Sequence, residues 1–274
     1  MSDELDIIIA GLRRTQKMLS PKYFYDDHGS KLFEEITQLP EYYLTNTELD
    51  IMAGNIDEMA AEIGERASLI EFGSGSSMKT RMLLAHMHSP AAYVPVDISE
   101  EHLHESQLSI QADCPEIEVL PVVADFMQPF DLPSPRTMPL RNVVYFPGST
   151  IGNFELDDAV SLLRVMHAEA GTDGALLIGV DLQKDPGIVN TAYNDSAGVT
   201  ARFNVNILRH LNRAFGSDFN LDAFAHRATY RPNEGRVVVE LVSRARQVVH
   251  IGNAEIEFTD GESIITEYSH KYTL

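Results

Sequence analysis

Acidic residues and a glycine-rich turn recur along this chain at the spacing of a nucleoside-binding site. The apolar run Leu69-Ile-Glu-Phe-Gly-Ser-Gly75 ends in two glycines, and Lys79 follows them at the start of a predicted helix. Glycines in such a turn remove Cβ atoms that would clash with a bulky polar ligand at the helix N-terminus. A dinucleotide fingerprint requires a third glycine where Met78 stands, so the turn favours an adenosine ligand without a pyrophosphate. S-adenosylmethionine is the candidate cofactor, and an NAD-type dinucleotide is the rival.

Three acids, Glu71, Asp97 and Asp125, each stand at the carboxyl end of a predicted strand. In an open parallel sheet these ends line the crevice that binds ligands. Asp97 is placed to accept both hydroxyl protons of a ribose. Asp125 is placed to accept from an adenine amino group while Phe126 covers the base. A single acid at a strand end is more often a turn or cap residue, but three behind a glycine turn favour a cofactor site. The order is similar to that of the class I S-adenosylmethionine-dependent methyltransferases.

Polar residues later in the chain suit a small zwitterionic substrate. Asn153 ends a glycine-rich turn after the fourth predicted strand and offers an amide donor and acceptor, unless it is a helix cap. Glu267 and Ser269 stand two residues apart on one strand face, where they can hold both nitrogens of an imidazole or simply face solvent. Lys79 either pairs with the methionine carboxylate of the cofactor or is a solvated helix residue. Tyr193 is a further polar aromatic near the start of the C-terminal region.

Composition narrows the classes of partner. The 274 residues carry a formal net charge of −20, which repels phosphate backbones and anionic lipid, so neither nucleic acid nor membrane is expected as a partner. Cys114 is the single cysteine, which excludes disulfides within the chain, and the histidines show no metal-ligand spacing, so no metal is expected. No apolar leader and no bilayer-spanning run occur, which predicts a soluble cytoplasmic protein.

The elements that must position these residues follow an α/β pattern. A capping box, Thr45-x-x-Glu48, predicts the start of a helix ahead of the first strand. Near-continuous apolar strands alternating with helices predict a parallel sheet covered by helices on both faces. With the similarity noted above, we expect it to be the Rossmann-like sheet of a class I methyltransferase. Strands are predicted at 68–72, 93–96, 118–123, 142–146 and 175–180. After Asp181 the pattern predicts a helix over 190–216 and antiparallel strands over 236–249, 255–258 and 263–272. We therefore predict a cofactor-binding domain over 1–188, with residues 21–45 as an N-terminal cover, and a smaller α+β substrate-binding unit over 189–274.

Six motifs in collinear order give the chain a specific resemblance. They are Lys22-Tyr-Phe-Tyr-Asp26, Leu39-Pro-Glu-Tyr-Tyr43, Glu71-Phe-Gly-Ser-Gly75, Gly148-Ser-Thr-Ile-Gly-Asn153, Asp195-Ser-Ala-Gly-Val-Thr200 and Thr266-Glu-Tyr-Ser269. Together they resemble the histidine-specific S-adenosylmethionine-dependent methyltransferases. The resemblance implies trimethylation of the α-amine of L-histidine to hercynine, the first step of ergothioneine biosynthesis.

The same resemblance implies the site residues, motif by motif. Those implied to contact S-adenosylmethionine are Gly73, Lys79, Asp97, Asp125 and Phe126, with Tyr25 as an extra wall near the amine. Those implied to hold the amino acid at the catalytic centre are Tyr42, Asn153 and Tyr193. Glu267 and Ser269 are implied to recognise the imidazole by hydrogen bonds to its nitrogens. The chemistry is in-line displacement at the sulfonium methyl by a neutral amine, which requires alignment rather than a protein nucleophile or a metal.

Two other functions fit the residues. A related methyltransferase could use another small amino acid, either a thiolated histidine or a tryptophan-like compound, although an indole offers one donor and no acceptor to Glu267 and Ser269. A catalytically silent cofactor-binding protein is the alternative outside enzymes. Members of the family are monomers that continue several tens of residues past the last motif, with a helix and the final strands. We therefore expect an incomplete sheet edge here, through which the chain could self-associate.

Overall fold

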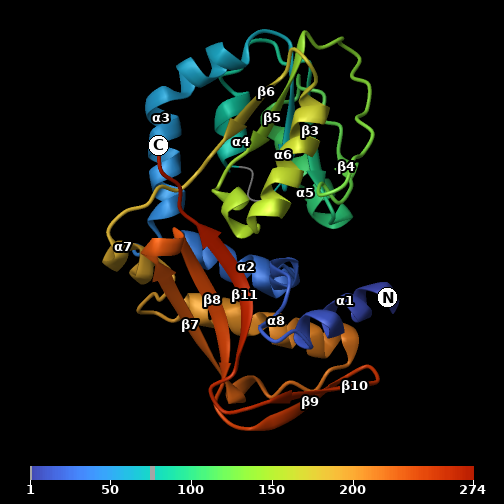
Figure 1. Cartoon of the computed structure of the whole chain (residues 1–274). Coiled ribbons are helices and arrows are strands. Elements are labelled where there is room, and N and C mark those ends of the chain that lie inside the picture. Colours follow the sequence, from blue (N-terminus) through green and yellow to red (C-terminus); the bar gives the residue numbers. More distant parts are fainter. Residues whose placement is uncertain (1, 75–77) are drawn as a thin grey trace. The chain divides into compact units, whose positions relative to one another are not determined.

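The computed structural model of the chain (Figure 1) describes residues 2–74 and 78–274, which fall into two units. Unit 1 combines Met1–Leu44 with Asp181–Leu274, and unit 2 is Thr45–Val180. The chain therefore divides elsewhere than the sequence predicts, because residues 21–44 do not group with the cofactor-binding domain. The short strand β1 (Lys17–Met18) pairs in parallel with β11 (Ser263–His270), and helix α2 (Asp27–Thr37) packs on helix α8 (Val199–Phe215). These contacts attach the N-terminal segment to the C-terminal one.

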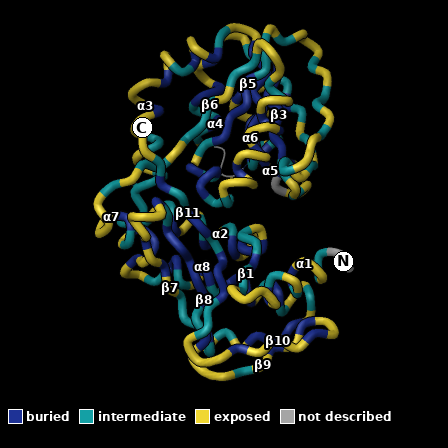
Figure 2. Tube along the Cα trace, viewed as in Figure 1, coloured by how far each residue is buried: buried dark blue, intermediate teal, exposed yellow. Residues whose placement is uncertain are grey.

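Unit 2 is built around a five-stranded parallel sheet with the order β4-β3-β2-β5-β6. All six residues of β2 are buried, including the neighbours Leu69 and Ile70 that point to opposite faces, so helices cover both sides of the sheet (Figure 2). The α/β class predicted from the apolar runs is confirmed. The elements are α3 (Tyr43–Ile63), β2 (Ala67–Phe72), α4 (Met78–Leu84), β3 (Ala92–Asp97), α5 (Glu100–Asp113), β4 (Val122–Val123), β5 (Arg141–Phe146), η2 (Thr150–Asn153), α6 (Leu156–Ala170) and β6 (Ala175–Ile178).

Unit 1 holds a four-stranded sheet with the order β1-β11-β8-β7, which α8 covers on one face. The β9–β10 hairpin forms a separate two-stranded sheet whose buried residues join the same core. The remaining elements are α1 (Ser2–Leu12), η1 (Pro21–Phe24), α7 (Pro186–Ala192), η3 (Leu221–Ala223), β7 (Phe224–Arg231), η4 (Pro232–Glu234), β8 (Arg236–Ser243), β9 (Gln247–Ile251) and β10 (Ala254–Phe258). A smaller α+β unit was expected, and the structure adds the N-terminal segment to it.

Several predicted boundaries are wrong for identifiable reasons. The strand expected over 118–123 is reduced to β4 and a single bridge at Val119, because Pro121 between them has no N–H to donate to a ladder. The helix expected over 190–216 is two helices, since Asp195 accepts from the N–H groups of Val199 and Thr200 and starts α8 there. The strand expected over 236–249 turns after Ser243, whose hydroxyl donates to the Ala245 carbonyl at 2.8 Å.

The capping box predicted at Thr45 and Glu48 is also wrong. Helix α3 begins at Tyr43, so Thr45 lies inside it, and Glu48 bonds to residues distant in sequence instead of to the helix start.

Within the part of the chain that the structure describes, no helix has the length and apolar character needed to cross a bilayer.

A β-bulge in β11 decides which of its side chains share a face. The register with β8 shifts between Ile265 and Glu267, which pair with Glu240 and Val239 respectively. Ile265 and Tyr268 are three residues apart, yet both pack in one cluster with Val238. In a regular strand such residues would point to opposite faces, so the bulge reverses the alternation. It directs Ser269 toward Tyr193 and leaves Tyr268 on the opposite face.

Candidate functional site

In unit 2 the end of β2 brings Gly73 and Phe126 together. Gly73 has a φ of +78°, in the left-handed region that favours glycine, and its N–H donates to the Val96 carbonyl at 2.8 Å. A Cβ on Gly73 would meet the Phe126 ring at 3.7 Å. Phe126 in turn packs against Phe72 and Phe146, with ring centroids 5.6 and 6.2 Å away. Gly73 and Phe126, both predicted to bind the cofactor, therefore lie side by side at the end of β2. Gly75 of the same predicted turn lies outside the described residues.

Glu71 serves a different purpose from the one its position suggests. Its carboxylate accepts from the Thr80 hydroxyl at 2.8 and 2.9 Å and from the Tyr93 hydroxyl, so it links β2 to β3 and α4 inside the core. Burial raises the pKa of this carboxyl to about 7, although both hydroxyl donors oppose the rise. Of the three strand-end acids, Glu71 is thus a structural one.

Asp97 and Asp125 each make a local turn at a strand end. Asp97 Oδ1 accepts from the Ser99 N–H at 2.9 Å, and Asp125 Oδ1 accepts from the Met127 N–H at 3.0 Å. Both acids therefore act as turn residues, as single strand-end acids usually do. A carboxylate offers about four acceptor positions, so these bonds leave each group able to accept ligand hydroxyl or amino protons as well.

Lys79 forms an ion pair that the sequence did not predict. Its Nζ lies 2.5 Å from Glu48 Oε2, and the Glu48 carboxylate also accepts from the Gly148 N–H at 2.9 and 3.0 Å. The Lys79 side chain is 15 % exposed, so its interpretation as a solvated helix residue is wrong. Asn153 ends η2 of the same loop, just after Ser149 holds a φ of +57°. That value is uncommon for a residue other than glycine, and a strained turn of this kind is typical of ligand-binding loops.

In unit 1 the predicted residues Tyr193 and Ser269 are in direct contact. The Tyr193 hydroxyl and Ser269 Oγ lie 2.7 Å apart. Lys271, directly after β11, places its Nζ 2.9 Å from the Tyr193 hydroxyl and 3.0 Å from Ser269 Oγ. It also pairs with Asp181 Oδ2 at 2.8 Å, and Asp181 accepts from the Tyr43 hydroxyl at 2.6 Å. No sequence signal distinguishes Lys271 and Asp181, because both are charged residues in otherwise unremarkable positions.

Glu267 and the remaining predicted tyrosines border this cluster. Burial raises the pKa of the Glu267 carboxyl to about 7, and the Lys271 charge opposes the rise. Tyr25 is 40% exposed and lies close enough to Glu267 for the carboxylate charge to act on its hydroxyl. The Tyr42 ring lies 6.2 Å from the Tyr193 ring, edge to face, and the Tyr25 ring lies 5.7 Å from that of Phe203. Unit 1 therefore brings together Tyr25, Tyr42, Tyr193, Glu267 and Ser269.

A second, partly buried chain of hydrogen bonds holds the backbone at Tyr193. His226 Nε2 lies 2.9 Å from the Tyr193 carbonyl, which can only accept, so this nitrogen carries the proton. Nδ1 is then the acceptor for the Asn204 amide at 2.9 Å. Asn204 Oδ1 accepts from Thr266, the bulge residue of β11, at 2.7 Å. Burial lowers the pKa of His226, in agreement with the neutral ring that these bonds require.

The predicted site residues are divided between the units. The cofactor residues Gly73, Lys79, Asp97, Asp125 and Phe126 belong to unit 2, as does Asn153. Tyr25, expected near the cofactor, belongs to unit 1 with the substrate residues. Among residues 2–74 and 78–274, no three histidine, cysteine or carboxylate side chains form a group able to hold a metal ion.

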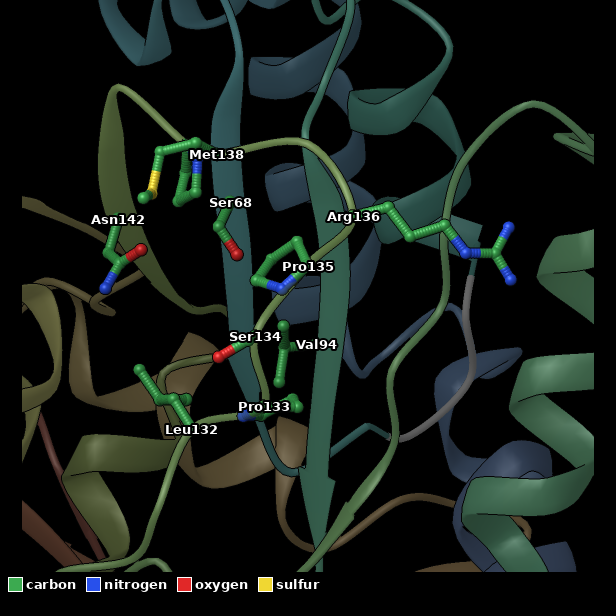
Figure 3. Close-up of a pocket in the computed structure, with 10 residues that line it drawn as sticks. Ser68, Val94, Leu132, Pro133, Ser134, Pro135, Arg136, Met138 and Asn142 are labelled. Carbon is green, nitrogen blue, oxygen red and sulfur yellow. The ribbon is translucent and has the colours of Figure 1, made fainter.

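A cavity of about 340 Å³ lies in unit 2, beneath the proline-rich segment 132–139 (Figure 3). Ser68 and Val94 of neighbouring strands form its back wall, and Pro133 and Pro135 lie over them, while the Arg136 guanidinium points away. None of the predicted site residues lines it.

Comparisons with known proteins place this chain beside one enzyme family. The model of the family described as "Histidine-specific methyltransferase, SAM-dependent" matches residues 3–274. The histidine N-alpha-methyltransferase of Mycolicibacterium smegmatis is 40% identical over 96% of this chain and 82% of its own length. The enzyme of the same name from Mycobacterium tuberculosis is 37% identical, over 97% and 83%. Ergothioneine biosynthesis protein 1 of Neurospora crassa is 30% identical over 86% of this chain and 29% of its own length.

Proposed function

The chain belongs to the histidine-specific, S-adenosylmethionine-dependent methyltransferases, and we propose that its substrate is the α-amine of L-histidine. It is therefore an enzyme, with S-adenosylmethionine as its methyl donor. The product we propose is hercynine, formed by three successive methyl transfers as the first step of ergothioneine biosynthesis. The observation that supports histidine most directly is the cluster in unit 1, where a carboxylate at Glu267 adjoins the hydroxyls of Ser269 and Tyr193.

The residues of unit 2 fit the methyl donor. The Cβ-free position at Gly73, against the Phe126 ring, leaves the backbone open to an adenosine. Asp97 and Asp125 supply carboxylate acceptors for the ribose hydroxyls and the adenine amino group. Lys79 supplies the cation for the methionine carboxylate, which would share it with Glu48. When bound, S-adenosylmethionine supplies an electrophilic methyl group on a positively charged sulfur.

The residues of unit 1 would hold the amino acid. Tyr193 orients its polar groups, and Tyr42, edge to face with Tyr193, forms an aromatic wall. Glu267 accepts from the ring N–H of the imidazole, and Ser269 contacts its other nitrogen. The amine attacks only as the free base, so it must lose a proton before each transfer. Its lone pair then forms the N–C bond while the C–S bond breaks toward sulfur. The rate should accordingly rise with pH until the bound amine is neutral.

Product mass tests the proposal directly. The chain is incubated with S-adenosylmethionine and L-histidine, and a gain of three methyl groups on histidine is expected. Glu267→Ala should raise the KM for histidine roughly 10- to 100-fold, the cost of losing a hydrogen bond to a charged group, and leave the cofactor Kd unchanged. The matched control is Glu262→Ala, which removes another paired carboxylate of unit 1 and should leave both constants unchanged. Equal losses of histidine and cofactor binding in Glu267→Ala would contradict the assignment.

A further inference from the structure

The buried lysine beside the predicted imidazole-binding residues has no role in the function described so far. The Lys271 side chain is 0% exposed, and its main chain is fixed on both sides. Its N–H donates to the Gly235 carbonyl at 2.6 Å, and the N–H of the next residue donates to the Asp181 carbonyl at 2.8 Å. An ammonium group buried without compensating partners would strongly destabilise the fold.

Every proton of the ammonium has a partner. Lys271 carries three N–H donors, and three oxygens lie within hydrogen-bond distance: Asp181 Oδ2 at 2.8 Å, the Tyr193 hydroxyl at 2.9 Å and Ser269 Oγ at 3.0 Å. Burial lowers the pKa of Lys271, while the Asp181 charge opposes this. Burial alone would raise the pKa of Asp181, but Lys271 and Lys184 hold it below its usual value. The pair is therefore ionised, and the lysine can only donate.

The remaining hydrogen bonds depend on the protons and lone pairs of the Tyr193 and Ser269 hydroxyls. Each has one proton and two lone pairs, and Lys271 occupies one lone pair on each oxygen. The bond between them, at 2.7 Å, uses one further proton and one further lone pair. The geometry allows either oxygen to donate, and the greater acidity of the phenol favours Tyr193 as the donor. Ser269 then has both lone pairs occupied and one proton left to give.

We propose that Lys271 is a specificity-determining positioning residue, which makes Ser269 an obligate hydrogen-bond donor toward the ring of the amino acid substrate. This inference rests on the proposed function. A donor at Ser269 and a carboxylate acceptor at Glu267 match a neutral imidazole, which has one bare nitrogen and one N–H. A ring with two N–H groups or none would leave one of these side chains unpaired, which is how polar sites reject close analogues.

Lys271 also sets the charge near Glu267. The titratable or charged groups that face this cluster are Tyr25, Tyr42, Tyr43, Asp181, Lys184, Tyr193, Tyr230, Glu267 and Tyr272. Lys271 is the cation that lowers the pKa of Glu267 against the effect of burial. Removing Lys271 should raise the pKa of Glu267 further. As the pH falls, histidine binding should therefore begin to weaken at a higher pH than in the wild type.

The test compares Lys271→Met with the wild-type chain and with Lys17→Met. Lys17 is a largely buried lysine of unit 1, paired with Glu262 and outside the predicted site. Calorimetry measures the Kd for L-histidine from pH 6 to pH 9 and the Kd for S-adenosylmethionine. Lys271→Met should raise the histidine Kd roughly 10- to 100-fold and move the acid limb of its pH profile upward, with the cofactor Kd unchanged. Lys17→Met should match the wild type in the histidine Kd, in its pH profile and in the cofactor Kd.

A double variant separates this role from simple charge compensation. Asp181→Asn with Lys271→Met removes the buried pair together, so no unpaired carboxylate remains. The weak histidine binding should persist in the double variant. Recovery of wild-type affinity there, or an unchanged Kd and pH profile in Lys271→Met, would overturn the inference. A wild-type chain that methylates no histidine would instead refute the proposed function.

Discussion

Glu71 is expected to make this protein less stable as the pH rises, which is opposite to the effect of most paired carboxylates. The residue is 4% exposed, and burial raises its pKa to about 7 from an ordinary value of 4.5. The native state therefore binds this proton more tightly than the unfolded chain does. Because of that difference, the contribution to the free energy of unfolding is complete below pH 4.5 and is lost as the pH rises through 7.

The size of the effect follows from the two pKa values. A carboxyl group that titrates at about 7 when native and 4.5 when unfolded contributes about 2.6 kcal/mol at pH 5 and about 0.1 kcal/mol at pH 8. Glu71→Gln has nothing to titrate at this position. The fall in stability between pH 5 and pH 8 should thus be about 2.5 kcal/mol larger for the wild type than for the variant.

Urea unfolding followed by far-ultraviolet circular dichroism measures this difference. The wild type, Glu71→Gln and the exposed control Glu65→Gln are unfolded at pH 5, 6, 7 and 8. The control should follow the wild type, because Glu65 lies at the surface. Parallel stability profiles for the wild type and Glu71→Gln would refute the reasoning, since they would mean that Glu71 binds its proton equally in both states.

Two further outcomes are expected. Asp195→Ala removes the carboxylate that accepts from two N–H groups at the start of α8, and should lower the free energy of unfolding by about 1 kcal/mol in thermal melts, whereas an unchanged melt would show that these two bonds contribute nothing. Lys79→Met should raise the calorimetric Kd for S-adenosylmethionine roughly 10- to 100-fold, with Lys31→Met on the exposed side of α2 as the neutral control. Equal cofactor affinity in Lys79→Met and wild type would leave Lys79 as a partner of Glu48 alone.

The central strands of unit 2 were predictable because the residues of each strand indicate whether its faces are buried. A strand covered on both faces needs a near-continuous apolar run, and β2, β3 and β5 each have one. The partner of Lys79 was not predictable in the same way. Glu48 matches a capping pattern at short range, but its real partners are Lys79 and the Gly148 N–H, which lie 31 and 100 residues further along the chain. Local rules give such an acid a local role, because they contain no information about what the fold brings near it.

In the substrate cluster, the sequence identified some of the predicted site residues but not the residues that position them. Spacing by two correctly placed Glu267 and Ser269 on one face of a strand, but a one-residue bulge decides which face that is. The bulge falls at Thr266, without a glycine or proline to mark it, and its hydroxyl is held by Asn204 of α8. Lys271 follows in the same alternation, where a lysine at a strand end is normally read as facing solvent. Asp181, 90 residues earlier in the chain, is the main group that compensates its charge, so that Lys271 can lie buried against Ser269. The residue that sets the polarity of the site is therefore one that no local pattern could select.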